Sequence, residues 1–218
     1  MRALVTGANG FLGKNLQVHL REKEIETVSF TREMFEEQLP ECLEGVDFVF
    51  HLAGVNRPKD PAEFAAGNKE LTEQLCDAIR ASGRQIPVIY TSSIQAEADN
   101  PYGASKKAAE QALIALERDA GSPVYIYRLP NVFGKWSRPN YNSAVATFCY
   151  NIANDLEIRI SDPAATIRLV YVDDVIADFL KLFSERPTGV MRPEIATGYT
   201  ISVGNLAEQI RAFKGSRE

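Results

Sequence analysis

The residues most clearly suited to chemistry are Tyr102 and Lys106, which stand four positions apart in the run Tyr-Gly-Ala-Ser-Lys. On a helix, side chains at positions i and i+4 lie on one face, so the phenol and the ammonium can converge. A phenol with a pKa of about 10 is a poor acid–base catalyst at neutral pH. A nearby ammonium favours the phenolate and lowers that pKa. The pair therefore predicts proton transfer involving a substrate oxygen.

Hydroxyl side chains stand upstream of this pair. Residues 87–92 are predicted as a strand, and Thr91-Ser92-Ser93 ends it. A hydroxyl at such a strand end can hold a substrate carbonyl oxygen. The helix expected over residues 101–118 begins with Pro101, where a missing N–H costs little.

A glycine-rich turn with the spacing G-x-x-G-x-x-G follows the first expected strand. Gly7 allows the sharp turn, Gly10 lets the backbone approach a pyrophosphate, and Gly13 permits close packing of helix on strand. The N-terminus of the following helix then offers free N–H groups to an anion. The turn predicts a dinucleotide site. Its expected cofactor contacts are Gly7, Asn9, Gly10, Phe11, Leu12 and Gly13.

The end of the second expected strand indicates which dinucleotide binds. An acidic residue there would bind the ribose hydroxyls of NAD. The sequence instead has Thr31 and Arg32, a hydroxyl and a guanidinium that suit the 2′-phosphate of NADP. Glu33 stands beside them, and the alternative is that Arg32 is an ordinary solvated charge. We expect NADP(H) as the cofactor.

Strands and helices alternate along the first part of the chain. Residues 3–6, 27–30, 46–52, 87–92 and 124–129 read as strands, and the segments between them include helices over 35–43, 68–81 and 101–118. This alternation predicts an α/β fold, a Rossmann-like doubly wound parallel sheet with helices on both faces. Ligands bind such sheets beyond the carboxyl ends of the strands.

The later part of the chain has a mixed pattern. Residues 143–153 and 174–183 are expected to be helical, residues 158–160 and 169–172 to be strands, and residues 187–193 to form a loop. A final amphipathic helix over 206–213 places Leu206, Ile210 and Phe213 on one face. We expect residues 1–130 to form an NADP-binding core. Residues 131–218 are expected to complete that core and to form a small C-terminal substrate-binding lobe.

The composition excludes several classes of protein. Hydrophobic residues make up 45% and charged residues 24%, as in globular proteins. A net charge of −5 argues against broad nucleic-acid binding. No apolar run approaches the roughly 20 residues of a membrane helix, and no signal peptide is recognised, so a cytoplasmic protein is expected. Cys42, Cys76 and Cys149 lack metal-type spacing, so no metal site is expected.

These motifs together resemble the extended short-chain dehydrogenase/reductases over roughly residues 1–183. The resemblance implies that Tyr102 is the proton donor, that Lys106 binds the nicotinamide ribose, and that a serine polarises the carbonyl. Ser93 corresponds by register, with Ser92 as the alternative. Asn68 resembles the helix asparagine that orders the proton relay. Leu52, Ala53 and Gly54, which follow His51, resemble the strand-end segment that borders the cofactor, whereas His51 itself is expected to be a packed histidine.

Further stretches resemble the substrate site of these enzymes. The run from Arg128 to Gly134 resembles the strand and turn that lead to the substrate, and the run from Arg168 to Asp174 resembles a segment whose arginine contacts the nucleotide diphosphate. Basic side chains in this region can also bind phosphate as planar guanidiniums or ammonium groups. The expected substrate contacts are Asn56, Arg57, Ser93, Asn131, Lys135, Arg138, Asn142 and Arg168.

The likeness is closer to a family of bacterial capsular-polysaccharide reductases on the route to UDP-N-acetyl-L-fucosamine. It rests on stretches such as Ser92–Ala96, Asp99–Gly103 and Phe133–Trp136. It implies NADPH-dependent reduction of the C4 keto group of a UDP-4-keto-6-deoxy-N-acetylhexosamine to UDP-2-acetamido-2,6-dideoxy-L-talose. Members of that family carry a C-terminal cupin. With only His19 and His51, this sequence is expected to lack the metal-ligand cluster of a cupin.

Two alternatives remain at this stage, a UDP-sugar 4-epimerase of the same fold and a non-catalytic NADP-binding protein. A dehydratase is disfavoured because Ile94-Gln95 stands where those enzymes have an Asp-Glu pair. The intact pair of Tyr102 and Lys106 speaks against an idle protein. We also expect a homodimer.

Overall fold

The computed structural model describes residues 1–31, 33–34, 38–56, 60 and 62–216, and it divides into two compact units. The first unit consists of Met1–Leu129 and Ile176–Glu194, and the second of Pro130–Val175 and Ile195–Glu218. The chain passes from one unit to the other three times. This is because Ile176–Glu194, which follows the first part of the second unit, belongs to the first unit.

The first unit contains a six-stranded sheet in the order β2-β1-β3-β4-β5-β8, with all neighbouring strands parallel. Its strands are β1 (Arg2–Thr6), β2 (Glu26–Phe30), β3 (Phe48–His51), β4 (Val88–Ser93), β5 (Val124–Leu129) and β8 (Val190–Met191). The strand order reverses between β1 and β3, which makes the carboxyl ends of these two strands the place where such sheets bind ligands. The predicted α/β fold with a doubly wound parallel sheet is confirmed.

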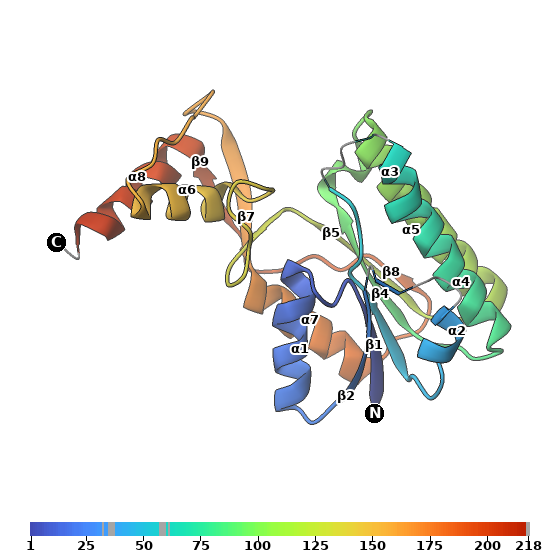
Figure 1. Ribbon diagram of the computed structural model, residues 1–218. Coiled ribbons are helices and arrows are strands. Elements are labelled where there is room, and N and C mark those ends of the chain that lie inside the picture. The colour runs from blue at the N-terminus through green and yellow to red at the C-terminus, as the bar shows by residue number, and fades with distance from the viewer. Residues whose placement is uncertain (32, 35–37, 57–59, 61, 217–218) are drawn as a thin grey trace. The chain divides into compact units, whose positions relative to one another are not determined.

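Helices cover both faces of this sheet (Figure 1). One face packs against α4 (Leu71–Ala81) and α5 (Pro101–Ala120), and the opposite side carries α1 (Phe11–Glu22) and the part of α7 (Val172–Glu185) from Ile176 onward. Two short helices, α2 (Leu39–Cys42) and α3 (Ala62–Phe64), complete the unit together with a π-helical turn (Ala65–Glu70) and a 3-10 turn (Ile94–Glu97).

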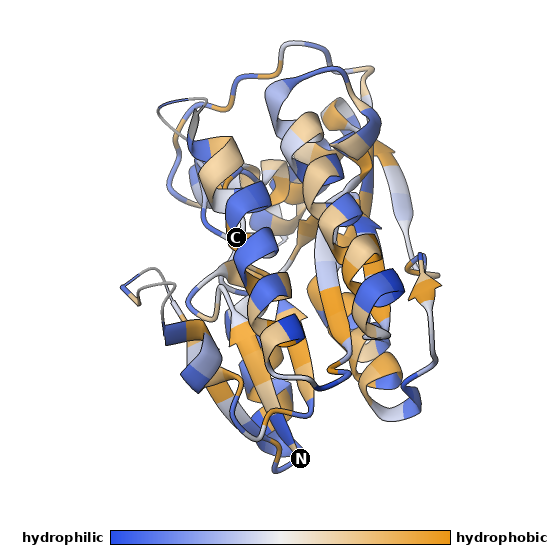
Figure 2. Ribbon diagram, turned by 90° about the vertical axis from the view of Figure 1, so that its right-hand side faces the viewer, coloured by the Kyte–Doolittle hydropathy of each residue, from blue (hydrophilic) through white to orange (hydrophobic). Residues whose placement is uncertain are grey.

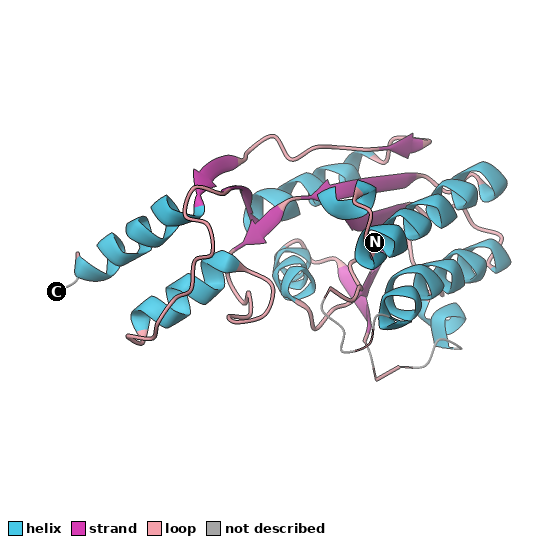
Figure 3. Cartoon of the chain, turned by 90° about the horizontal axis from the view of Figure 1, so that it is seen from above, coloured by secondary structure: helices cyan, strands magenta, loops and turns pink. Residues whose placement is uncertain are grey.

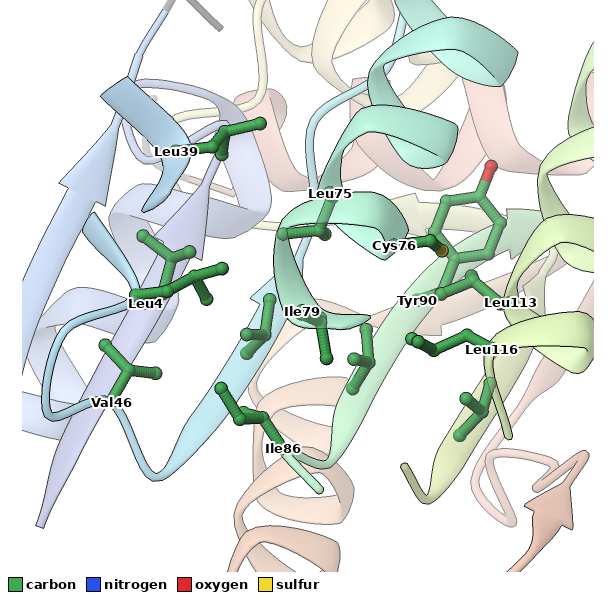
Figure 4. Close-up of a cluster of buried hydrophobic side chains, with 14 of the residues drawn as sticks. Leu4, Leu39, Val46, Leu75, Cys76, Ile79, Ile86, Tyr90, Leu113 and Leu116 are labelled. Atoms are coloured by element: carbon green, nitrogen blue, oxygen red, sulfur yellow. The ribbon is translucent and has the colours of Figure 1, made fainter. Parts of the chain in front are cut away.

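The core of the first unit follows from the alternation of side chains along the strands. Leu4, Val49, Val88 and Ile126 belong to one buried cluster with Leu75, Ile79, Leu113 and Leu116 of α4 and α5. Figure 4 shows Leu4 and these four helix residues. The opposite face is aromatic: the rings of Phe48 and Phe183 lie 5.1 Å apart, and those of Tyr127 and Phe179 lie 4.8 Å apart. In Figure 2 the strands are accordingly mostly orange, whereas the helices carry blue stretches.

The second unit has its own small sheet and its own core. Strand β6 (Asn131–Phe133) pairs in parallel with β7 (Thr166–Tyr171), which pairs antiparallel with β9 (Tyr199–Ser202). Helices α6 (Ala144–Ala153) and α8 (Val203–Gly215) lie side by side (Figure 3). Buried residues of these two helices and of β7 form a separate cluster: Phe148, Ile152, Leu169, Leu206 and Ala207.

Most differences from the sequence prediction fall after residue 130. Residues 158–160 are irregular rather than a strand, because Ile158 and Ile160 reach the second core without pairing to another strand. The predicted loop over 187–193 contains β8, which pairs with β5. Phe213 is 68% exposed and does not share the buried face of α8 with Leu206. Strands β6 and β9 were not predicted.

In the first unit, the predicted helix over 68–81 starts earlier, as α3 and a π-helical turn. The predicted helix over 35–43 is described only in part, as Leu39–Cys42, because residues 35–37 lie outside the described residues. None of the helices in the described part of the chain combines the length and the apolar character needed to cross a lipid bilayer.

Candidate active site

The glycine-rich turn joins β1 to α1 as a tightly packed loop. Gly7 has a φ of +68°, and its N–H donates to the carbonyl of Phe30 at 3.0 Å. A Cβ atom on Gly7 would lie 2.8 Å from the backbone of Ala53, and one on Gly13 would lie 2.3 Å from the carbonyl oxygen of Gly7. Larger residues therefore cannot stand at these two positions without moving backbone.

The loop also leaves the start of α1 accessible. Gly10 is the N-cap, and as a glycine it has no side chain that could accept from the first N–H groups of the helix. The first N–H groups of a helix have no partner within it, and the helix dipole favours an anion there. The tight cradle and the uncapped helix together fit the pyrophosphate of a dinucleotide.

At the end of β2, the hydroxyl of Thr31 donates to the carboxylate of the exposed Glu33 at 2.5 Å. The residues expected to bind the 2′-phosphate of NADP are Thr31 and Arg32. Arg32 lies outside the described residues, as does the predicted substrate residue Arg57. A carboxylate therefore lies beside one of the two residues expected to bind a phosphate.

The strand-end segment after β3 runs directly against the predicted catalytic residues. The N–H of Ala53 donates to Thr6 Oγ1 at 3.2 Å. A Cβ atom on Gly54 would lie 2.9 Å from Asn68 Oδ1 and 3.0 Å from Lys106 Nζ. Glycine at this position lets the backbone approach both side chains. The structure thus brings the predicted cofactor-binding segment and two predicted catalytic residues together.

Asn68 is buried in the π-helical turn and clamps two segments. Its Oδ1 accepts from the N–H of Val55 at 2.9 Å, and its Nδ2 donates to the carbonyl of Val55 at 3.0 Å. Nδ2 also donates to Ser105 Oγ at 3.0 Å, and Ser105 donates to the carbonyl of Tyr102 at 2.8 Å. Asn68 therefore fixes the segment after β3 relative to the start of α5.

His51 is the packed histidine that its sequence context predicts. Its Nδ1 lies 2.7 Å from Thr6 Oγ1, and its Nε2 lies 2.8 Å from Thr72 Oγ1. Thr72 gives its own proton to the carbonyl of Asn68 at 2.6 Å, so Nε2–H is the donor to Thr72 and Nδ1 accepts from Thr6. Burial, followed by the charge of Lys106, lowers the pKa of His51 to about 3. The ring is a neutral link between β1, β3 and α4.

The helix that carries the tyrosine and lysine is held firmly at its start. Asn100 is the N-cap of α5 and accepts from the N–H of Gly103 at 2.8 Å. A Cβ atom on Gly103 would lie 2.3 Å from the carbonyl oxygen of Gln95 and 2.5 Å from that of Ala98. Close packing against the 3-10 turn therefore fixes the position of the residue beside it, Tyr102.

Lys106 lies on the same helix and is almost completely buried. Its ammonium donates to the carbonyl of Thr91 at 3.0 Å and lies 4.9 Å from the centroid of the Tyr90 ring. Burial lowers the pKa of Lys106 to about 8, and the nearby carboxylate of Glu110 opposes that shift. Lys106 is thus a buried cation whose charge depends on a few contacts.

Tyr102 is half-buried, and burial raises the pKa of its phenol, whereas a hydrogen bond with Ser93 lowers it. The spacing of Tyr102 and Lys106 predicts that the lysine lowers the pKa of the phenol. The structure differs, because the Lys106 ammonium is directed at Thr91 and the Tyr90 ring. Ser93, rather than the lysine, opposes the effect of burial on the tyrosine.

The two candidate serines have separate partners. Ser92 is buried, and its hydroxyl donates to Glu110. Ser93 is partly exposed, accepts from the N–H of Gln95 at 3.2 Å and hydrogen-bonds Tyr102. The geometry favours Ser93 as the hydroxyl beside the phenol.

Two residues near the site were missed by the sequence analysis. Glu110 is 2% exposed and holds the guanidinium of Arg128, which also pairs with Glu97 at 2.6 Å. The sequence could have indicated Glu110, because it stands one helical turn after Lys106. No sequence pattern distinguishes Tyr90, because an aromatic residue in an apolar strand is typical of any core.

The remaining predicted substrate residues belong to the second unit, apart from Asn56, which is partly buried in the first. Asn131 donates to the carbonyl of Arg168 at 3.3 Å, and Lys135 pairs with Asp173 at 3.1 Å. Arg138 lies over the Tyr141 ring at 5.4 Å, and Asn142 is exposed. The β6–β7 pairing thus brings Asn131 and Arg168 together.

The chain belongs to the NAD dependent epimerase/dehydratase family, whose model matches residues 3–194. It is 58% identical over 219 residues to a UDP-2-acetamido-2,6-beta-L-arabino-hexul-4-ose reductase of Pseudomonas aeruginosa. That match covers 100% of this chain and 59% of the relative, so the chain spans less than two thirds of the relative's length.

Solved structures show the same fold. The capsular polysaccharide assembling protein CapF from Staphylococcus aureus is 40% identical with a TM-score of 0.88, and the match covers 100% of this chain and 59% of that chain. MoeE5 in complex with UDP-glucose and NAD has a TM-score of 0.89 at 24% identity, over 99% of this chain and 82% of that chain. At that identity, the second match shows the fold alone.

Proposed function

We propose that this chain catalyses the NADPH-dependent reduction of the C4 keto group of a UDP-2-acetamido-2,6-dideoxy-hexos-4-ulose. The observation that carries the proposal is the hydrogen bond between Ser93 and Tyr102, one helical turn before the buried Lys106. The support for this substrate is the relative with 58% identity, which is named for a reductase of such a sugar. Reduction is favoured over 4-epimerisation for the same reason.

The proposed roles follow from the contacts of each residue. Tyr102 donates a proton to the carbonyl oxygen as general acid, and Ser93 stabilises the charge that develops on that oxygen. Lys106 holds the nicotinamide ribose, and Asn68 keeps Tyr102 in place through Ser105. The nicotinamide cofactor, when bound, supplies the hydride that goes to C4.

The residues that would hold the cofactor surround the carboxyl ends of β1, β2 and β3. Gly7, Gly10 and Gly13 form a cradle that a Cβ would fill, which suits a pyrophosphate. Thr31 and Arg32 would bind the 2′-phosphate of NADP, and Leu52, Ala53 and Gly54 would border the rest. The proposed loop contacts also include Asn9, Phe11 and Leu12.

The proposed substrate contacts extend beyond the reacting carbonyl. Asn56, Arg57, Asn131, Lys135, Arg138, Asn142 and Arg168 are the residues assigned to the UDP-sugar. In this proposal, residues 1–130 are the NADP-binding core, and residues 131–218 complete it and provide the substrate lobe. A homodimer in the cytoplasm completes the proposal.

The test is the reaction of the chain with a UDP-4-keto-6-deoxy-N-acetylhexosamine and deuterated NADPH. A reductase consumes one NADPH for each sugar and leaves deuterium at C4, as seen by NMR of the product. Turnover of the sugar without net consumption of NADPH would instead indicate an epimerase. Absence of any reaction would contradict the proposal.

Replacement of Tyr102 by Phe tests the assigned general acid. The change removes one oxygen and leaves the glycine loop and Lys106 in place, so NADPH should bind nearly as before. Loss of a positioned general acid should lower kcat and kcat/KM together by about 10²–10⁴-fold. A variant that keeps more than about a tenth of the wild-type kcat, with chemistry rate-limiting, would rule out this role.

A further inference from the structure

A buried lysine needs partners that keep it charged. Lys106 is 3% exposed, and moving an ammonium out of water disfavours its charged form. Its ammonium donates a hydrogen bond to the carbonyl of Thr91, which carries no charge. The carboxylate of Glu110 helps, but it is already engaged with Arg128 and Ser92. A further group that stabilises the charged form of Lys106 is therefore expected among its neighbours.

The Tyr90 ring is the aromatic surface that Lys106 meets. The ammonium nitrogen lies 4.9 Å from the ring centroid, within the distance of about 6 Å at which a ring face attracts a cation. This attraction is strongest where water is excluded, and both residues are buried. The contact joins β4 to α5, one helical turn after Tyr102.

The hydroxyl of Tyr90 adds no visible contact of its own. The side chain is fully buried, and among the residues that the structure describes the hydroxyl has no hydrogen-bond partner. Figure 4 shows the ring beside Cys76 and Leu113, with the oxygen directed away from them. A buried hydroxyl without a partner destabilises a fold, so packing alone would favour phenylalanine here. The ring is the part of Tyr90 that makes contacts.

We propose that Tyr90 is a positioning residue whose aromatic face holds the Lys106 ammonium in place and charged for cofactor binding. This inference rests on the proposed function, because it gives Lys106 the role of holding the nicotinamide ribose. The ring acts through Lys106 and touches neither the sugar nor the reacting carbonyl.

Four titratable groups surround Lys106. Glu110 lies one turn after it and Tyr102 one turn before it on α5, Tyr90 lies on β4, and His51 lies on β3. His51 stacks on Tyr90 with ring centroids 5.3 Å apart and is neutral because burial lowers its pKa to about 3. A charged histidine would repel the ammonium. Glu110 and the Tyr90 ring are thus the two groups that favour the cation.

The experiment compares Tyr90→Phe, which keeps the ring, with Tyr90→Leu, which removes it. Lysine side chains are labelled with ¹³C and ¹⁵N, and the Lys106 signal is assigned from its loss in Lys106→Met. The pKa of Lys106 should be about 8 in the wild-type protein. It should be unchanged in Tyr90→Phe and lower in Tyr90→Leu by about half a unit to one and a half units.

Cofactor affinity provides a second readout. At a pH near 8, Tyr90→Leu should bind NADPH about two- to tenfold more weakly, whereas Tyr90→Phe should bind it like the wild type. Tyr90→Phe should also unfold at an equal or higher temperature, because it removes the unpartnered hydroxyl.

Tyr125→Leu is the matched control for lost packing. Tyr125 is a fully buried tyrosine on the neighbouring strand β5 and packs with Phe48 on the other face of the sheet. This variant should lose stability but keep the pKa of Lys106. An unchanged pKa in Tyr90→Leu, or the same shift in Tyr90→Phe, would overturn the proposal. None of these readouts needs the sugar, so the proposed reaction can fail without affecting them.

Discussion

At the scale of single residues, two adjacent serines that look alike in sequence take different positions. Ser92 is buried and donates to Glu110 in the middle of α5, whereas Ser93 is partly exposed and hydrogen-bonds Tyr102 at the start of that helix. Because side chains alternate along a strand, the two adjacent hydroxyls have different surroundings. Sequence alone could place a hydroxyl at this strand end, but only the register of β4 distinguishes the two.

This separation predicts different losses for the two alanine variants. Ser93→Ala should lower kcat by about 10²–10³-fold, as for loss of one donor to a developing oxyanion, with stability retained. Ser92→Ala should leave most of the activity but reduce the free energy of unfolding by about 1–3 kcal/mol, because buried Glu110 loses a donor. Steady-state kinetics and denaturant unfolding of both variants measure this. The reverse pattern would assign the catalytic hydroxyl to Ser92.

His51 predicts how stability depends on pH. Its pKa is about 3 in the folded protein and about 6.5 when unfolded. Because the folded value is depressed, the stabilising contribution is complete above the unfolded pKa and is lost as the pH falls toward 3. Between pH 7 and pH 5 the free energy of unfolding should fall by roughly 2 kcal/mol from this group.

The variant His51→Gln should reduce this dependence, although it also lowers stability at neutral pH. His19 is the matched control, since it is the other histidine of the chain and lies on the partly exposed surface of α1. His19→Gln retains the buried His51, so the steep fall in stability between pH 7 and pH 5 should persist. Equal slopes for the wild type and His51→Gln would contradict a buried neutral histidine.

At the scale of elements, the position of helix α5 depends on a glycine beside Tyr102, the proposed general acid. A Cβ on Gly103 would lie 2.3 Å and 2.5 Å from two carbonyl oxygens of the preceding turn. Gly103→Ala should therefore push the start of α5 away, reduce stability by about 1–3 kcal/mol and lower kcat. Gly215→Ala is the control, because, apart from its two chain neighbours and its own helix backbone, no atom of the described residues lies within 4 Å of its added Cβ. Stability and kcat of both variants check this, and an active, stable Gly103→Ala would show that α5 can shift without harm.

The elements that the sequence predicted well are those with local signals. Strand β5 has the predicted bounds, and β1, β4 and α5 start or end within two residues of prediction, because hydrophobic periodicity, glycine turns and a proline mark them. Strands β6, β8 and β9 are two to four residues long and owe their existence to pairing with distant strands. No local sequence pattern predicts pairing between strands that are far apart in the chain.

The same division explains the candidate site. The glycine loop, and the placement of Tyr102 and Lys106 one turn apart on one helix, could be predicted from spacing along the chain, whereas the direction of the Lys106 ammonium toward Thr91 and Tyr90 could not. The clamp of Asn68 on Val55 and Ser105 joins residues 13 and 37 positions apart. The contact of Lys106 with Tyr90 crosses from helix to strand. These contacts depend on tertiary packing, and the resemblance to a family indicated Asn68 where spacing alone could not.

At the scale of the whole molecule, two units with separate cores divide the proposed tasks. The glycine loop, the Tyr102–Lys106 pair and the long parallel sheet belong to the first unit, whereas Asn131, Lys135 and Arg168 belong to the second. A ligand that binds only the folded first unit stabilises that unit by mass action. Cofactor binding can therefore be measured by thermal unfolding, without any sugar.

The last prediction uses this linkage to test cofactor choice. At a concentration of about 100 times its Kd, NADPH should stabilise the first unit by roughly 2.7 kcal/mol, which raises Tm by about 5–10 °C for a unit of this size. Thr31 and Arg32 stand where an acid would favour NAD, so NADPH should bind at least tenfold more tightly than NADH. At equal concentrations that ratio corresponds to about 1.4 kcal/mol and a Tm difference of about 3–6 °C. Arg32→Gln should remove the difference, whereas Arg118→Gln on the exposed surface of α5 should keep it. An equal or larger shift with NADH in the wild type would mean that Glu33, which accepts from Thr31, makes this an NAD site.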